Sequence, residues 1–301
     1  MSTTPPEVLP LQVNALQVSV VPVKPAHLQW LNDTGDRLKT ADGKIVEVWE
    51  LAYNSDEATL QAWAKHFRSH YCPDDSIDFL RGKQTRKEFL ENIKFPSSSS
   101  KLGPAVRAGD FCEILVADYL QWILGYWVPR VRWNSKIVRD ESPKGSDVIG
   151  FYFDKAGQVS PKDALAVFES KARFSNSSGK DRLQDAINDS AKDRIRIDES
   201  LSYIKQRLFE KGSKEEAAKV ERFQNPVDIP YREIHGAAAI YSTEFLDTSA
   251  ISGADTQKIP VGKNGHFRPH PNAKNLILVV IKGKDMMTLV HELYRRAADE
   301  A

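Results

Sequence analysis

The chain has 301 residues, enough for a large hydrophobic core, and its length alone suggests about two domains. Hydrophobic residues make up 41% and charged residues 28%, a balance that excludes both a wholly disordered chain and a membrane bundle. The net charge of +1 does not mark the whole molecule as a nucleic-acid binder, so contact with DNA requires a local basic patch.

The N-terminal stretch MSTTPPEVLP lacks the basic and apolar regions of a secretory signal. The longest apolar run, residues 276–281, falls far short of the roughly 18 residues that a membrane-spanning helix needs. The two cysteines, Cys72 and Cys112, cannot build a structural zinc site alone. We therefore expect a cytoplasmic protein without membrane contact.

The first third of the chain predicts a small α+β domain. Residues 11–23 and 44–52 are rich in Val, Leu and Ile, and the turn sequence Thr40-Ala41-Asp42-Gly43 between them favours a small antiparallel sheet. An amphipathic helix is predicted from about Ser55, and the spacing of Thr85 and Glu88 is typical of a capping box at the start of a second helix. The serine-rich residues 96–104, bracketed by prolines, then separate an N-terminal domain (1–96), a candidate for partner binding, from a second domain (97–301).

The second domain is predicted to be α/β, in the order helix, three strands, helix, two strands, helix. We expect the helices over residues 107–124, 180–211 and 285–298, and the strands over residues 127–137, 147–153, 165–174, 236–242 and 275–281. The last two strands are continuous apolar runs, which indicates a sheet covered by helices on both faces.

Three charged residues fall at the junction of two predicted strands. Glu169 and Lys171 stand two residues apart, so the strand period of two places both on one face. Asp147 opens the preceding strand. If the two strands pair as an antiparallel hairpin, the start of one adjoins the end of the other and Asp147 meets Glu169 and Lys171. Burying these charges is costly unless each finds a partner.

Two neighbouring carboxylates repel each other, and a hard divalent cation relieves that repulsion while taking water and phosphate oxygens as further ligands. We therefore predict a Mg²⁺ (or Mn²⁺) site with Asp147, Glu169 and Ser170 as metal residues and with Lys171 as a catalytic partner of the two acids. A bound ion lowers the pKa of its water and polarises a phosphodiester, and a lysine can orient that water. The expected activity is hydrolysis of DNA.

Glu113 is a candidate fourth catalytic residue, carried by the helix predicted over residues 107–124. Its i−4, i+3 and i+4 neighbours are glycine, valine and alanine, so its carboxylate lies along a mostly apolar face and needs a partner. Two alternatives remain open. The partner is either a metal-bound water or Lys171, or else an arginine such as Arg130 or Arg132 that forms a salt bridge with it.

Candidates for DNA contact come from a helix face, a strand end and two basic segments. Gln184, Asn188 and Lys192 recur at intervals of four, which suits either a DNA groove or a solvated stripe, and Arg173 follows the Glu-x-Lys strand. Acidic residues lie in or beside both basic segments, so each is either a DNA-binding patch or a solvated charged face. The segments contain Arg130, Arg132, Lys136 and Arg139, and Lys180, Arg182, Lys192, Arg194 and Arg196.

A Glu-x-Lys triplet arises readily by chance and indicates a nuclease only within the right order of elements. The order helix, three strands with Asp and Glu-x-Lys, helix, strand resembles the PD-(D/E)xK nuclease superfamily, with Ser146 where that pattern has proline. A closer resemblance, mainly over residues 97–301, is to the HamA component of the Hachiman anti-phage defence systems. The segments that carry it are GSDVIG (145–150), FESKAR (168–173) and RAGDFCEIL (107–115).

The resemblance to HamA implies a nuclease effector that a superfamily 2 helicase holds and releases to degrade DNA during infection. It also implies Asp147 and Glu169 as metal ligands and Lys171 as the catalytic lysine. We expect little sequence specificity, because no recognition helix or zinc finger supplies base readout. One alternative is a catalytically silent nuclease fold that serves as a scaffold or regulatory subunit of a helicase complex, and another is a sequence-specific restriction enzyme.

Overall fold

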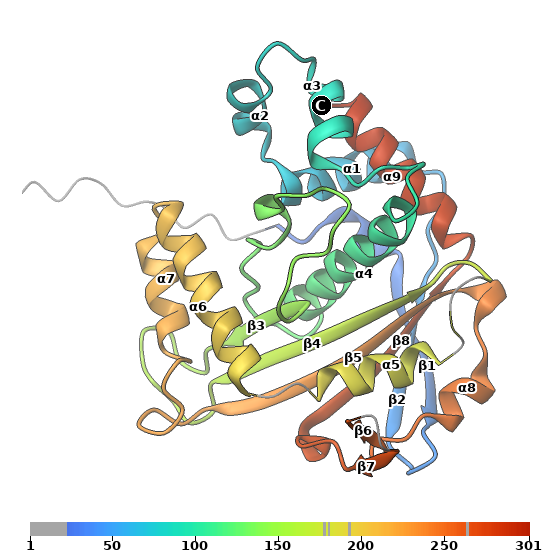
Figure 1. Cartoon of the computed structure of the whole chain (residues 1–301), viewed down its shortest axis with the longest axis vertical. Coiled ribbons are helices and arrows are strands. Elements are labelled where there is room, and N and C mark those ends of the chain that lie inside the picture. Colours follow the sequence, from blue (N-terminus) through green and yellow to red (C-terminus); the bar gives the residue numbers. More distant parts are fainter. Residues whose placement is uncertain (1–22, 177–178, 180, 192–193, 263–264) are drawn as a thin grey trace, which may run out of the picture.

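The structure, a computed structural model, describes residues 23–176, 179, 181–191, 194–262 and 265–301. Six strands of this described part form one mixed sheet: β1 (Leu31–Lys39), β2 (Ile45–Leu51), β3 (Val148–Tyr152), β4 (Ala164–Arg173), β5 (Arg232–Ser242) and β8 (Leu276–Gly283). Two short strands, β6 (Ile259–Val261) and β7 (His266–Arg268), pair separately. The predicted α/β class with a mixed, helix-flanked sheet is confirmed (Figure 1).

Helices connect these strands. The α-helices are α1 (Glu57–Tyr71), α2 (Asp74–Leu80), α3 (Arg86–Phe89), α4 (Gly103–Trp122), α5 (Arg182–Ser190), α6 (Arg194–Glu210), α7 (Lys214–Glu221), α8 (Thr248–Gly253) and α9 (Met286–Asp299). Shorter turns of helix are η1 (Ala26–Gln29), η2 (Leu90–Lys94), η3 (Trp133–Ser135), η4 (Thr243–Phe245) and η5 (Ala273–Asn275). Within the described residues, no helix combines the length and the apolar character that crossing a membrane requires.

The sheet has the strand order β1-β2-β8-β5-β4-β3. Its four inner strands run parallel, whereas the edge strands β1 and β3 are each antiparallel to their neighbour. Parallel inner strands need helical crossovers, which is why helices follow β4 and β5 and lie over the sheet. Strand β3 at one edge is joined to β4 by hydrogen bonds on one side, and on its outer side Trp127 forms an isolated bridge with Phe151.

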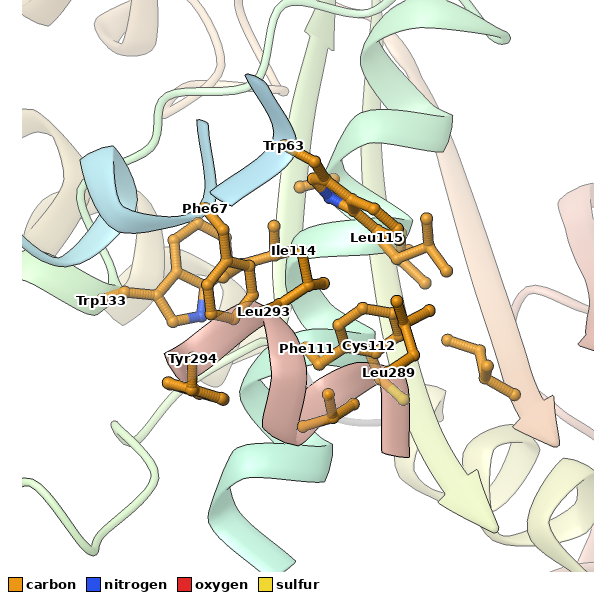
Figure 2. Close-up of a cluster of buried hydrophobic side chains, with 14 of the residues drawn as sticks. Trp63, Phe67, Phe111, Cys112, Ile114, Leu115, Trp133, Leu289, Leu293 and Tyr294 are labelled. Carbon is orange, nitrogen blue, oxygen red and sulfur yellow. The ribbon is translucent and has the colours of Figure 1, made fainter. Parts of the chain in front are cut away.

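Each face of the sheet has its own hydrophobic packing. Helices α1, α4 and α9 gather on one face (Figure 1), where α1 supplies Trp63 and Phe67, α4 supplies Phe111, and α9 supplies Leu289 and Leu293 (Figure 2). The opposite face is covered by α5 and α8 over the centre of the sheet and by α6 and α7 over the β3–β4 side. A sheet buried on both faces accounts for the continuous apolar sequences of β5 and β8.

The N-terminal hairpin is part of the main sheet, so the prediction of a separate small sheet is wrong. Strand β2 pairs in parallel with β8, and the core formed with α4 and α9 includes side chains of α1. Strand β2 pairs with β1, which was not predicted because its sequence, LNDTGDRLK, is mostly polar. Residues 11–22 of the strand predicted in its place lie outside the described residues. The boundary between residues 96 and 97 stays a prediction.

Two further predictions need correction. Residues 127–137 form no regular strand, because only Trp127 bridges to Phe151 and residues 133–135 form η3. Pro129 lacks a backbone donor, and Arg130, Arg132 and Lys136 pair with carboxylates of α4. The helix predicted over residues 180–211 is divided into α5 and α6, and it ends as predicted before Gly212, which has a φ of 80°.

Candidate active site

The predicted β-hairpin is confirmed and brings Asp147 beside the Glu169 strand. Strands β3 and β4 are antiparallel, with Val148 opposite Phe168, so Asp147, one residue before β3, lies next to Glu169. The backbone N–H of Ser170 donates a hydrogen bond of 3.0 Å to Oδ2 of Asp147. Asp147 thus covers the edge of β4 just before β3 begins.

Glu169 and Lys171 lie where the apolar part of β4 ends. Leu165 and Val167 on the same face belong to the core under α6 and α7, whereas Phe168 on the other face packs in the core with α4. The Glu169 residue is only 1% exposed, and about a quarter of the Lys171 side chain is exposed. The strand therefore passes from a dry core to a charged end within a few residues.

Lys171 has a carboxylate partner that sequence reasoning missed. Its Nζ lies 2.5 Å from Oδ2 of Asp189 on α5. Burial alone would lower the pKa of Lys171, but the hydrogen bond to Asp189 and the charges of Asp147, Asp189 and Glu169 outweigh it and raise the pKa. Lys171 is therefore a cation at neutral pH. The sequence signal was the position of Asp189 on the helix that follows the Glu-x-Lys strand.

Arg132 forms hydrogen bonds with two acidic residues of the site, Glu113 on α4 and Asp147 just before β3. Its guanidinium donates to Oε2 of Glu113 at 2.8 Å and to Oδ1 of Asp147 at 3.3 Å. It also donates to the backbone carbonyls of Pro143 at 2.8 Å and Ser146 at 2.9 Å. One side chain thus fixes the loop that leads into β3 and, with it, the position of Asp147.

Glu113 has the arginine partner, which is one of the two alternatives that the sequence left open. Besides Arg132, the indole N–H of Trp133 donates to its carboxylate at 3.1 Å. The pKa of Glu113 is raised to about 8, because burial and the charges of Asp147 and Asp110 outweigh the opposing charge and hydrogen bond of Arg132. Glu113 is therefore held beside Asp147 by Arg132 and not by Lys171.

The turn before Asp147 depends on a glycine. Gly145 has a φ of 102°, which side chains other than glycine rarely adopt. A Cβ atom there would also lie 2.9 Å from Oγ of Ser200 on α6, the atom to which the Ser146 N–H donates at 3.2 Å. A cavity of about 570 Å³ borders this turn, between residues 128–149 and the α6 side chains Glu199, Ser200, Tyr203 and Ile204.

The predicted DNA-contact residues are engaged inside the protein. Gln184 accepts a hydrogen bond from the backbone N–H of Asp255 at 2.7 Å and donates to the carbonyl of the same residue at 3.3 Å. Arg173 is 5% exposed and donates to the carbonyl of Phe245 at 2.8 Å. These two side chains are therefore held by contacts within the protein, and their contact with DNA stays a prediction. Lys192 lies outside the described residues.

The basic side chains of the first segment have partners inside the protein, and DNA binding by this segment stays a prediction. Arg130 pairs with Asp118 and Lys136 with Asp110, at 2.6 Å and 2.7 Å, and Arg139 donates to the carbonyl of Glu91. Buried carboxylates on α4 need such cations, which explains why the segment is basic. In the second segment, Arg182 pairs with Asp185 and Arg196 is exposed, while Lys180 and the Arg194 side chain are not among the described parts.

Comparison with known families places this chain. The sequence profile of the HamA family matches residues 25–297, most of the chain, and the chain therefore belongs to the HamA family. HamA is a component of the Hachiman anti-phage defence system, which implies that the chain acts together with a partner. No curated protein matches the chain. The match begins before β1, so the family includes the N-terminal hairpin as well as the candidate site.

Proposed function

We propose that this chain is a Mg²⁺-dependent DNA nuclease and the effector of its defence system, with Asp147, Glu169 and Lys171 as catalytic residues. The observation that carries the proposal is the β3–β4 hairpin, which joins Asp147 to the Glu169–Lys171 strand through the Ser170 N–H. The proposed reaction is hydrolysis of phosphodiester bonds with little sequence specificity.

The residues fit a hard divalent cation. Asp147 and Glu169 offer carboxylate oxygens, which Mg²⁺ and Mn²⁺ prefer. The N–H and C=O of one strand residue point to the same side, so the Ser170 carbonyl is directed to the edge where its N–H meets Asp147. The Ser170 side chain alternates to the other face, and we therefore assign its backbone oxygen, not its hydroxyl, as the ligand.

Mg²⁺ in this position would polarise the phosphodiester and lower the pKa of a bound water. Lys171 supplies a positive charge at the same place, because Asp147, Asp189 and Glu169 keep its pKa raised. Its ammonium group can donate hydrogen bonds to the attacking water and offset the charge that grows on the phosphate oxygens. Asp189 holds that group in position from α5.

The order of elements supports a PD-(D/E)xK nuclease core. Helix α4 precedes the β3–β4 hairpin, α5 follows it, and the next strand of the sheet, β5, lies parallel to β4. Glu113 on α4 comes within the charge network of Asp147 through Arg132. Of the three strands that the resemblance implies, the first, expected over residues 127–137, is reduced to the Trp127–Phe151 bridge.

We further propose that the partner is a superfamily 2 helicase that restrains the nuclease until infection. Membership of the HamA family supports the presence of a partner protein. The proposal that this partner is a helicase rests on the resemblance to HamA proteins. A net charge of +1 and the internal use of Arg130, Arg132 and Lys136 suit a nuclease that meets DNA within a complex.

The test is plasmid degradation in Mg²⁺ by the purified chain, alone and with the helicase if a neighbouring gene encodes one. We expect smears from the wild type and a loss of about 100-fold or more in Glu169→Gln and Lys171→Ala. Matched controls on the surface, Glu210→Gln and Lys65→Ala, should keep full activity. Equal activity in all five proteins would overturn the proposal, and discrete fragments would indicate sequence-specific restriction.

The second candidate function is a catalytically silent scaffold or regulatory subunit of a helicase complex. Its specific support is that internal cations already contact the acidic residues, since Arg132 contacts Asp147 and Glu113. A wild-type chain that degrades no DNA with its partner, yet still assembles with it, would favour this function.

A further inference from the structure

A second cluster of metal-ligating side chains lies away from the β3–β4 hairpin, between α1, η1 and α4. Nε2 of His27 lies 3.0 Å from Oδ2 of Asp118, and Nε2 of His66 lies 3.0 Å from Oδ1 and 3.1 Å from Oδ2 of the same carboxylate. One ligand atom from each of the three residues falls within 4.8 Å of the others. The three side chains therefore converge on one point.

We propose that His27, His66 and Asp118 bind a divalent transition-metal ion, best matched by Zn²⁺, which fastens η1 and α1 to α4. Two imidazoles and one carboxylate with an open fourth position form a familiar zinc ligand set. Ligand atoms about 2.0 Å from a tetrahedral ion lie roughly 3.3 Å apart, so the separations of the two histidine nitrogens from Asp118 need to widen by only a few tenths of an ångström.

The protonation states suit metal binding. Burial lowers the pKa of His27, so its ring is neutral at pH 7. The pKa of Asp118 is held well below its usual range, because the charges of His66 and Arg130 and the hydrogen bonds from both histidines outweigh burial. A neutral imidazole and an ionised carboxylate are the forms that ligate a metal.

Groups around the cluster orient its ligands. Arg130 donates to Oδ1 of Asp118 at 2.6 Å, while Oδ2 lies within 3.1 Å of Nε2 of both histidines. The His27 ring stacks on Trp63 with centroids 4.4 Å apart. Its Nε2 donates to the ionised Asp118 in the absence of a metal, and its buried Nδ1 has no hydrogen-bond partner among the described residues, so the proton would move to Nδ1 when Nε2 ligates an ion. Neighbouring side chains that hold metal ligands in place are a general feature of metal sites.

The site is reachable from solvent on one side. Asp118 and His27 are fully buried, but His66 is about a quarter exposed and lines a cavity of about 510 Å³ together with His70 and Arg130. The fourth position therefore opens toward this cavity. The positive charge of Arg130 favours an anion such as hydroxide there over neutral water.

The test is metal binding by the full chain after chelation. We expect one Zn²⁺ per chain by elemental analysis, and a visible four-coordinate spectrum when Co²⁺ is titrated in its place. His66→Ala should weaken Zn²⁺ binding more than about 100-fold, which is a larger loss than removal of a residue that only supports a ligand would cause. The control His266→Ala, which changes an exposed histidine, should bind Zn²⁺ as the wild type does. Glu169→Gln should also bind Zn²⁺ normally, so this result is independent of the nuclease proposal.

A thermal measurement guards against a variant that only loosens the fold. Chelation should lower the melting temperature of the wild type by about 5 °C and leave that of His66→Ala unchanged. Zinc binding of equal strength in wild type and His66→Ala would overturn the proposal. So would a chain that takes up no Zn²⁺ at micromolar concentration, in which case Asp118 is held by hydrogen bonds and Arg130 alone.

Discussion

A single arginine organises the acidic residues of the candidate site. Arg132 reaches Glu113 on α4, Asp147 before β3 and three backbone carbonyls of the intervening loop. Burial lowers the pKa of an arginine, but here the charges of Glu113 and Asp147 and the hydrogen bond to Glu113 raise it. The position of Asp147 therefore depends on a residue from a segment that has no regular secondary structure.

The buried Glu113 predicts a pH dependence of stability. Its pKa is raised in the folded protein from an ordinary value of 4.5 to about 8, so the folded state binds a proton that the unfolded state has released. The stability that this proton confers is present below the ordinary pKa and is lost as pH rises through the folded value.

Glu113→Gln mimics the protonated side chain and should remove this dependence. We expect the free energy of unfolding of the wild type, relative to the variant, to fall between pH 4.5 and pH 8 by up to about 1.4 kcal/mol per pH unit. Urea unfolding across this range measures it. Parallel pH profiles of the two proteins would show that Glu113 is ionised throughout.

The sequence predicted the charged residues Asp147, Glu169 and Lys171 of the candidate site, but it did not predict several of the residues that contact them. Strand periodicity correctly placed Glu169 and Lys171 on one face, and the hairpin brought Asp147 to them. Asp189 and the cluster of His27, His66 and Asp118 depend on how α5, η1 and α1 pack on the sheet and on α4. Such packing between distant segments cannot be read from the local sequence around these residues.

Strands β4 and β5 show how closely two elements approach. Gly236 on β5 lies opposite Phe168 on β4, and a Cβ atom there would overlap the Phe168 ring. Phe168 itself is fully buried among the side chains packed around α4, so the ring cannot move aside freely. The glycine therefore permits the large aromatic side chain that anchors β4 just before Glu169.

Gly236→Ala should destabilise the protein by ~1–3 kcal/mol, because the core is already close-packed. Gly109→Ala in α4 should instead stabilise it by ~0.5–1 kcal/mol, because the new Cβ meets no atom within 4 Å apart from its chain neighbours and the backbone of its own helix. Chemical denaturation of the two variants measures both effects. A neutral Gly236→Ala would mean that Phe168 repacks without cost.

Elements with strong apolar patterns were predicted well and polar ones were not. The predicted ranges agree within a few residues with helices α4 and α9 and strands β4, β5 and β8. These elements are buried, and their apolar residues show a clear pattern in the sequence. Strand β1 was missed because most of its residues are exposed, with a pattern that shows no alternation. The strand expected over residues 127–137 failed because its inward-facing residues are basic, and their burial depends on carboxylates of α4.

The described residues fold around one main sheet, although the sequence suggests two parts. Strand β2 is hydrogen-bonded to β8, and side chains of α1 complete the core over α4 (Figure 2). Removing residues 1–96 would expose this core and the edge of β8 to water. Exposed apolar surface and an unpaired strand edge both favour aggregation.

A fragment of residues 97–301 should therefore fail to fold independently. We expect it to be insoluble, or to lack the cooperative thermal transition of the full chain in circular dichroism. A soluble fragment with a sharp transition would support the predicted boundary between residues 96 and 97 and contradict a shared core.

Binding of Mn²⁺, followed by calorimetry on zinc-loaded protein, tests the nuclease site most directly because it does not require the partner or DNA. The wild type should show one site that is lost in Asp147→Asn and Glu169→Gln but retained in Lys171→Ala, since the lysine is not a ligand. Identical Mn²⁺ binding in all four proteins, or none in the wild type, would contradict a metal centre formed by Asp147 and Glu169.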